Sequence, residues 1–468
     1  MKQFLLVLLF FSSHLAISQQ VILTGKAAYA PNELVRVIVY DDQFSHLEKT
    51  IASTRTDAWG VFSLEFNVQI TDFAFLAVGL KKGEFYLKPA STYVFNVLQD
   101  TSEPGSIFDE IPLQFEMTAK DGGLNDAIGR FNENYNRFVY ENANRIYKGR
   151  DRKLITDFGD ASLAQSAGMS DSYFSDYVEY TLASLEWVSA KMPSEEIISN
   201  YFINKKILYN NIQYTDFFAE FFKAYLGNNS FFDYNAVNEA INHSSNFTTF
   251  DKLLKQDTLL AKNNAIRELA ATQILARRYN NPDISQKKVI DIFNDLGKNS
   301  GYPEIRKISL NYIKKLQHLN YGTPAPIFSL KNQAGEQISL KQFEGKFILL
   351  NFVKSDCQIC LSQFQTINEI IEPVKGKWQV LTIVYGPDFK KVVQYASERA
   401  FDWPFLTLDN DILLLEKYNI RTYPTYALIN PDGTIAMATA PMPDEMLDLY
   451  MNKLVLKYEK AHSNEGRK

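Results

Sequence analysis

The chain has 468 residues but only two cysteines, and both lie in the segment Lys354-Ser355-Asp356-Cys357-Gln358-Ile359-Cys360. Residues 347–353 before it are mostly apolar, as in a buried strand, and residues 361–374 after it place apolar side chains at helical spacing. A sulfur at the start of a helix lies near the unpaired amides, which together with the helix dipole stabilise a thiolate. Cys360 lies one turn later and can close a disulfide with Cys357. This spacing predicts a redox site.

Other chemistries are less well supported. Zinc would need two further ligands near Cys357 and Cys360. The sequence offers no such pair, because the histidines after residue 19 are scattered and none is at ligand spacing to another histidine or to a cysteine: His46, His243, His318 and His462. A Cys–His hydrolase stays an alternative in principle, but the Cys-x-x-Cys spacing weighs against it. We therefore expect neither a metal nor another cofactor.

Further motifs follow the cysteine pair. Residues 380–385 have the composition of a second buried strand, residues 389–399 have helical periodicity, and Tyr423-Pro424-Thr425 precedes another apolar run. With these motifs the region from Gly322 to Leu456 resembles the thioredoxin superfamily, in which an x-Pro-Thr segment carries a cis proline beside the Cys-x-x-Cys. Its lead-in, residues 322–330, is similar to that of TlpA/ResA-type thioredoxins and of peroxiredoxins.

The resemblance implies an α/β thioredoxin-like fold and thiol–disulfide exchange, with Cys357 as the attacking and Cys360 as the resolving cysteine of a redox-active disulfide. It also implies that Tyr423 and Pro424 line the substrate groove and that Pro424 keeps metal away from the dithiol. The expected partners are protein thiols or disulfides of the cell envelope, and a membrane electron donor is a further candidate.

Several positions depart from the family pattern. Asp356 precedes the first cysteine, and a carboxylate there opposes the helix dipole and disfavours the thiolate. Asn351 and Gln363 stand where relatives carry acids that handle protons for the second cysteine, and neither amide can take a proton. Tyr423 is bulkier than the usual residue before the proline. These residues predict that Cys360 releases the mixed disulfide slowly, or that another base takes part in the release.

Two other functions compete with disulfide exchange. A thiol peroxidase shares the lead-in, but Lys354 occupies the position where peroxiredoxins place a threonine. A non-enzymatic envelope binding protein could use the thioredoxin-like domain as a scaffold. Both cysteines and the Tyr-Pro-Thr segment are present, which favours the enzyme.

The length suggests roughly three domains. Residues 20–117 show period-two patterns and turn signals, which predict an all-β sandwich whose last strands, residues 85–89 and 93–97, form a pair. Residues 118–320 show helical periodicity, which predicts an all-α middle region. Residues 321–460 form the C-terminal thioredoxin-like domain. The predicted fold class is therefore multidomain.

Residues 1–19 resemble a signal peptide: Lys2, an apolar stretch, and a small-residue cleavage site at Ala16-Ile17-Ser18. The apolar stretch is too short to span a bilayer, and no later stretch is long enough, so we expect no transmembrane anchor. The formal charge of −5 makes nucleic acid an improbable partner. We expect an exported protein of the periplasm or cell envelope.

Overall fold

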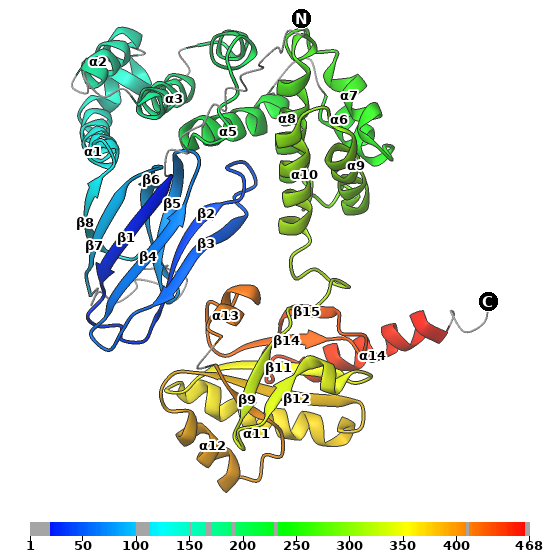
Figure 1. The fold of residues 1–468 in the computed structure, drawn as a ribbon. Coiled ribbons are helices and arrows are strands. Elements are labelled where there is room, and N and C mark those ends of the chain that lie inside the picture. Colours follow the sequence, from blue (N-terminus) through cyan, green and yellow to red (C-terminus); the bar gives the residue numbers. More distant parts are fainter. Residues whose placement is uncertain are drawn as a thin grey trace, which may run out of the picture. The chain divides into compact units, whose positions relative to one another are not determined.

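A computed structural model describes residues 19–99, 112–149, 151–164, 171–189, 192–228, 233–408 and 411–463 (Figure 1). The predicted signal peptide lies outside these residues, except for Gln19. The chain forms two compact units, one consisting mainly of residues up to Tyr225 and the other mainly of residues from Leu226 onward. The predicted multidomain fold class, with β, helical and thioredoxin-like parts, is confirmed.

Over its described residues, the first unit begins with eight strands in two four-stranded sheets, of order β4-β1-β7-β8 and β3-β2-β5-β6. The strands are β1 (Gln20–Lys26), β2 (Leu34–Tyr40), β3 (Glu48–Arg55), β4 (Val61–Asn67), β5 (Asp72–Val78), β6 (Lys81–Leu87), β7 (Thr92–Val97) and β8 (Phe115–Lys120). Alternate residues of both sheets, such as Leu23, Val37 and Leu76, share one buried cluster. The two sheets therefore enclose a common core, as in a β-sandwich.

The predicted pairing of residues 85–89 with residues 93–97 is wrong, because β6 and β7 belong to different sheets. The link between them is short and includes Ala90 in a left-handed conformation, with φ 56°. The Tyr93 hydroxyl accepts a hydrogen bond from the Lys88 N–H at 2.8 Å and donates one to the Tyr86 carbonyl at 3.1 Å. These hydrogen bonds stabilise the link through which the chain passes from β6 in one sheet to β7 in the other.

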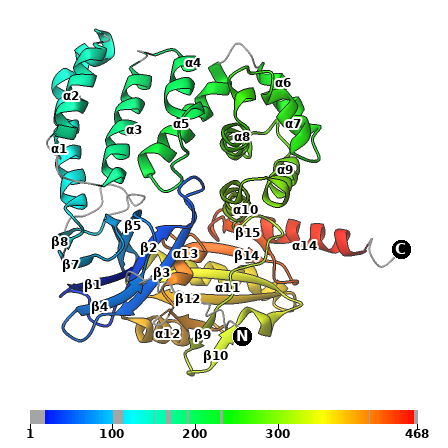
Figure 2. The same cartoon turned by 45° about the horizontal axis from the view of Figure 1, so that its top comes forward.

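The helices of the first unit are α1 (Leu124–Ala143), α2 (Arg152–Ala164), α3 (Ser172–Val188), α4 (Ser194–Ile197) and α5 (Ile212–Asn228), with π-helical turns at η1 (Asn144–Lys148) and η2 (Ile198–Ile203). Helices α1 and α3 pack on the outer face of the second sheet, where Ile38, Phe75 and Phe131 join one buried cluster (Figure 2). Strands β2 and β5 are thus covered on both faces, which explains their nearly continuous apolar sequences.

The second unit begins with α6 (Tyr234–Asn242), α7 (Phe247–Leu254), η3 (Leu260–Lys262), α8 (Asn264–Arg278), α9 (Gln286–Asn299) and α10 (Pro303–Leu316). Asp251 of α7 pairs with Arg267 of α8 at 2.6 Å, and the Arg267 side chain is only 3% exposed. The Tyr312 hydroxyl of α10 donates to Gln273 of α8 at 2.7 Å. Polar contacts therefore tie these helices together beside their apolar packing.

The C-terminal part is a seven-stranded sheet of order β10-β9-β13-β12-β11-β14-β15. Its strands are β9 (Ser329–Asn332), β10 (Gln337–Ser339), β11 (Phe347–Lys354), β12 (Trp378–Tyr385), β13 (Phe405–Thr407), β14 (Thr425–Ile429) and β15 (Ile435–Ala440). Its helices are η4 (Leu340–Phe343), α11 (Gln358–Ile371), η5 (Glu372–Val374), α12 (Phe389–Glu398), α13 (Leu413–Lys417) and α14 (Leu447–Ser463). Central strand β11 runs parallel to β12 and antiparallel to β14.

Two apolar cores cover the two faces of this sheet. Leu349 and Val353 of β11 join a cluster with α11, α12 and α14, whereas Leu350 and Phe352 join a cluster with α13. Figure 1 accordingly shows α11 and α12 on one side of the sheet and α13 on the other. Burial on both faces explains why β11 is apolar almost throughout and ends at the exposed Lys354.

Candidate functional site

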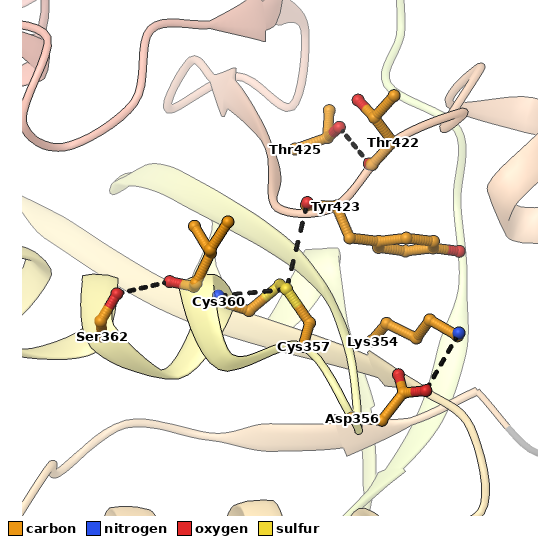
Figure 3. Close-up of a disulfide and its surroundings, with 9 residues drawn as sticks. Lys354, Asp356, Cys357, Cys360, Ser362, Thr422, Tyr423 and Thr425 are labelled. Carbon is orange, nitrogen blue, oxygen red and sulfur yellow. Dashed lines mark hydrogen bonds and ion pairs between the residues drawn. A yellow bond between two sulfur atoms is a disulfide. The ribbon is translucent and has the colours of Figure 1, made fainter. Parts of the chain in front are cut away.

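The two cysteines lie where β11 turns into α11. Cys357 is the N-cap of α11, with extended backbone angles, and a disulfide joins it to Cys360 with 5.2 Å between their Cα atoms. The Cys360 N–H donates a hydrogen bond to the Cys357 sulfur at 3.1 Å (Figure 3). Cys357 is partly exposed and Cys360 is completely buried. The helix start therefore offers one accessible sulfur and one inaccessible sulfur.

The segment before β14 lies against the disulfide. The Tyr423–Pro424 peptide bond is cis, as the resemblance implied, and the Tyr423 carbonyl oxygen lies 4.0 Å from the Cys357 sulfur (Figure 3). Tyr423 is partly exposed and stacks on Tyr385 with 6.2 Å between ring centres. Burial, and secondarily Tyr385, raise the pKa of the Tyr423 phenol above its ordinary value. Tyr423 thus stays neutral beside the disulfide.

Asp356 does not act alone on the first cysteine. Its carboxylate pairs with the Lys354 ammonium at 3.1 Å, and both side chains are largely exposed (Figure 3). The Lys354 charge offsets the Asp356 charge, and solvent screens both. The expected opposition of Asp356 to the thiolate is therefore weaker than the sequence suggested.

Two residues that shape this turn, Ser355 and Gly386, were not predicted from the sequence as part of the site. Ser355 is buried, its N–H donates to the Tyr385 carbonyl at 2.8 Å, and its Oγ accepts from the Asp388 N–H at 3.3 Å. Gly386 has φ +114°, and a Cβ there would lie 2.5 Å from the Ser355 Oγ. In the sequence, the feature that could have indicated this turn is the glycine directly after the apolar run of β12, because glycine often adopts backbone conformations that other residues avoid.

The two neutral amides are buried behind the disulfide. Asn351 of β11 is 0% exposed, and its Nδ2 donates to the Thr382 Oγ1 at 3.4 Å. Trp403 Nε1 donates to the same hydroxyl at 2.9 Å. Gln363 of α11 is 9% exposed, and its Nε2 donates to Asp444 Oδ2 at 3.4 Å. Within the part of the chain that the structure describes, the Asn351 and Gln363 carbonyl oxygens have no hydrogen-bond partner.

Cys357, Cys360, Tyr423 and Pro424 are brought together at one edge of the domain. Among the described residues, no group of three or more His, Cys, Asp or Glu side chains is arranged to hold a metal ion. Where the structure describes the chain, no helix is both long and apolar enough to span a bilayer.

A Cys-x-x-Cys pair at the start of the helix that follows the central strand, beside a cis X-Pro peptide, defines a thioredoxin-like domain. The comparisons with known proteins agree with this class. Residues 321–438 match the family model described as AhpC/TSA family.

Individual relatives match over the same region. The chain is 30% identical over 125 residues to the thioredoxin-like protein YneN of Bacillus subtilis, covering 26% of this chain and 74% of that protein. It is 28% identical over 138 residues to the thiol-disulfide oxidoreductase ResA of B. subtilis, covering 29% of this chain and 76% of that protein. A solved thioredoxin domain of a Bacteroides vulgatus thiol-disulfide oxidoreductase matches at 23% identity and TM-score 0.27, covering 30% of this chain and 97% of that one. Through its C-terminal domain the chain belongs to the thioredoxin-like thiol-disulfide oxidoreductase family.

Proposed function

We propose that this protein is exported and exchanges disulfides with proteins of the cell envelope through Cys357 and Cys360. The observation that carries the proposal is the unequal exposure of the two sulfurs at the start of α11. Cys357 is partly exposed as the helix N-cap, whereas Cys360 is 0% exposed. A substrate can reach only the first of them, which is the asymmetry that ordered exchange requires.

The exchange proceeds in two substitutions at sulfur. In the reduced protein, the Cys357 thiolate attacks a substrate disulfide, a mixed disulfide forms, and one substrate thiolate leaves. The Cys360 thiolate then attacks the Cys357 sulfur, the mixed disulfide breaks, and the second substrate thiolate leaves. The protein is oxidised by two electrons and the substrate is reduced by two. An oxidised protein that meets a dithiol runs the same steps in reverse, and the two reduction potentials decide the direction.

The backbone around Cys357 supports the first substitution. The helix N-terminus favours the thiolate form of the sulfur. The Cys360 N–H, 3.1 Å away, donates to the sulfur in the disulfide and is placed to donate to a thiolate as well. The Tyr423 carbonyl also lies near the Cys357 sulfur, and the Tyr423 ring stacks on Tyr385. Together they form an uncharged surface beside that sulfur. An extended substrate segment would meet polar backbone and apolar ring surface there.

The partners and compartment follow from the same proposal. The substrates are protein thiols or disulfides of the envelope, and a membrane electron donor would return the protein to the reduced state. The support is twofold: relatives named thiol-disulfide oxidoreductases and a signal-peptide pattern over residues 1–19. The mature N-terminus should then lie near Gln19. Mass spectrometry of exported protein that still begins at Met1 would contradict export by cleavage.

Trapping with single-cysteine variants tests the function. Cys360→Ser should hold envelope proteins as mixed disulfides, because Cys357 can attack but nothing releases the product. Cys357→Ser should trap none, because the remaining thiol is buried. Equal trapping by both variants would contradict the ordered roles, and trapping by neither would favour the scaffold function. Peroxide consumption by the reduced protein that outpaces disulfide exchange would favour the peroxidase.

A further inference from the structure

Three buried side-chain oxygens on the α11 side of the C-terminal sheet have no hydrogen-bond partner among the described residues. They are the carbonyl oxygens of Asn351 and Gln363 and the hydroxyl of Tyr426. Tyr426 is 1% exposed. Buried polar atoms are almost always hydrogen-bonded in proteins, so three orphaned oxygens in one place need an explanation. A catalytic role or a bound water would supply one.

The three side chains lie on the side of the sheet that carries the second cysteine. Asn351 and Tyr426 are directly opposite each other in the β11–β14 register, so their side chains lie on the same face of the sheet. Tyr426 belongs to the buried cluster that contains Cys360. Gln363 follows Cys360 by three residues on α11, which places both on one side of the helix. Cys360 therefore shares the α11 side of the sheet with a polar patch formed by Asn351, Gln363 and Tyr426.

Gln363 connects this patch to a carboxylate. Its Nε2 donates to Asp444 Oδ2 at 3.4 Å, which leaves its orphaned carbonyl oxygen for another donor. Asp444 lies in the segment between β15 and α14 and is exposed to solvent. Its carboxylate therefore contacts the buried patch through Gln363 and also bulk water. A proton that reaches the Asp444 carboxylate from the interior can therefore pass to bulk water.

The apolar cluster around Cys360 also contains phenol side chains. Those that pack on the Cys360 cluster are Tyr426 of β14, Tyr423 before it, Tyr395 of α12 and Tyr458 of α14. Burial, and secondarily Asp444, raise the pKa of the Tyr426 phenol above its ordinary value. Tyr426 thus keeps its proton. Asp444 contacts this patch through Gln363, and its carboxylate can accept a proton.

We propose that Asp444 accepts the proton of Cys360 through a water held by the orphaned oxygens of Gln363, Asn351 and Tyr426. The inference rests on the proposed function and deepens it. The Cys360 thiol gives its proton to that water, and the water gives a proton to the Asp444 carboxylate, while the amides and the Tyr426 hydroxyl only hold the water in place. The Cys360 thiolate then attacks the Cys357 sulfur, and the substrate leaves as a thiolate. Asp444 thereby serves as the base for Cys360, which Asn351 and Gln363 cannot be because an amide does not accept a proton.

Single-turnover kinetics of the full chain with 5,5′-dithiobis(2-nitrobenzoate) separate the two substitutions. The first equivalent of coloured nitrothiobenzoate reports capture by Cys357, and the second reports release by Cys360. Asp444→Asn keeps an oxygen for Gln363 but removes the carboxylate. It should slow release about tenfold or more near neutral pH while leaving capture unchanged, and the release profile should shift to higher pH. Tyr426→Phe should slow release as well.

Controls distinguish proton transfer to Asp444 from a structural role. Asp448→Asn makes the same chemical change at an exposed acid in the first turn of α14 and should change neither phase. Asp444→Glu restores a carboxylate and should recover at least part of the release rate. Release by Asp444→Asn at the unmodified rate would overturn the proposal, as would capture and release slowed equally without recovery in Asp444→Glu. If the unmodified protein shows no capture phase, the proposed function itself fails, which is a separate outcome.

Discussion

The sulfur of Cys357 accepts a hydrogen bond from the backbone N–H of Cys360 at 3.1 Å. One residue of the pair thus caps the helix that carries the other. Because the cap sits at the surface and the next turn points into the core, the same helix start makes the two sulfurs chemically different.

This difference predicts unequal reactivity in the reduced protein. Iodoacetamide near neutral pH should modify Cys357 at least about tenfold faster than Cys360, because the first sulfur is exposed and stabilised as a thiolate. Peptide mapping by mass spectrometry after short exposure measures both rates. Denaturation should remove the difference, which serves as the control. Similar rates in the folded protein would mean that the burial of Cys360 does not protect it.

The exposed pair Lys354–Asp356 should tune capture in opposite directions. Asp356→Asn should speed capture and Lys354→Gln should slow it, each within about fivefold, because solvent screens charges at the surface. Both effects should shrink in 1 M salt. Capture rates with a small aromatic disulfide at low and high salt provide the measurement. Effects that persist at high salt would point to a change of structure instead of charge.

Gly386 should tolerate no side chain. Gly386→Ala combines φ +114° with a Cβ 2.5 Å from the Ser355 Oγ, so we expect a loss of about 1–3 kcal/mol in stability and slower capture. Ser355→Ala removes the clashing oxygen. The double variant should therefore lose less stability than the sum of the two single variants. Thermal unfolding followed by tryptophan fluorescence gives the comparison, and strict additivity would argue against the clash.

The buried ion pair Asp251–Arg267 should matter more than an exposed one. Arg267→Ala removes a side chain that is 3% exposed, while the pair between Asp251 and the largely exposed Lys255 remains. We therefore expect α7 and α8 to lose about 3 kcal/mol of protection against hydrogen exchange. Lys287→Ala breaks the ion pair between Lys287 and Asp291. Because the Lys287 side chain is 84% exposed, this change should cost under about 0.5 kcal/mol of protection. Hydrogen exchange of the helices in each variant measures both. Equal losses would contradict the ranking by burial.

A fragment from Asn320 onward should fold on its own and form the Cys357–Cys360 disulfide. The lead-in supports this boundary, because the N–H groups of Gly322 and Ala325 donate to the carbonyls of Ile435 and Gly433 at 2.8 and 3.0 Å. Circular dichroism and a cooperative urea transition test folding. An unfolded fragment beside a folded full-length chain would show that α10 and its neighbours complete the domain.

The sequence alone predicted the features that depend on neighbouring residues. The apolar run of β11, the helical spacing of α11 and the Cys-x-x-Cys between them are local patterns, so they located the site and indicated its chemistry. The change from period-two to helical patterns likewise indicated β, helical and α/β parts in that order. Motif resemblance added the cis Tyr423–Pro424 bond, because an x-Pro-Thr segment is recognisable without knowing its surroundings.

Only the tertiary structure decided which distant residues meet. Strands β6 and β7 are close in sequence but lie in different sheets, since the shared core between the sheets outweighs their proximity. Gln363 meets Asp444 across 81 positions, and Asn351 lies opposite Tyr426 through the β11–β14 register. Such contacts are set by the packing of whole elements, because a shift of one residue in a strand would turn every side chain to the other face. The surroundings of Cys360 therefore could not be derived from local spacing.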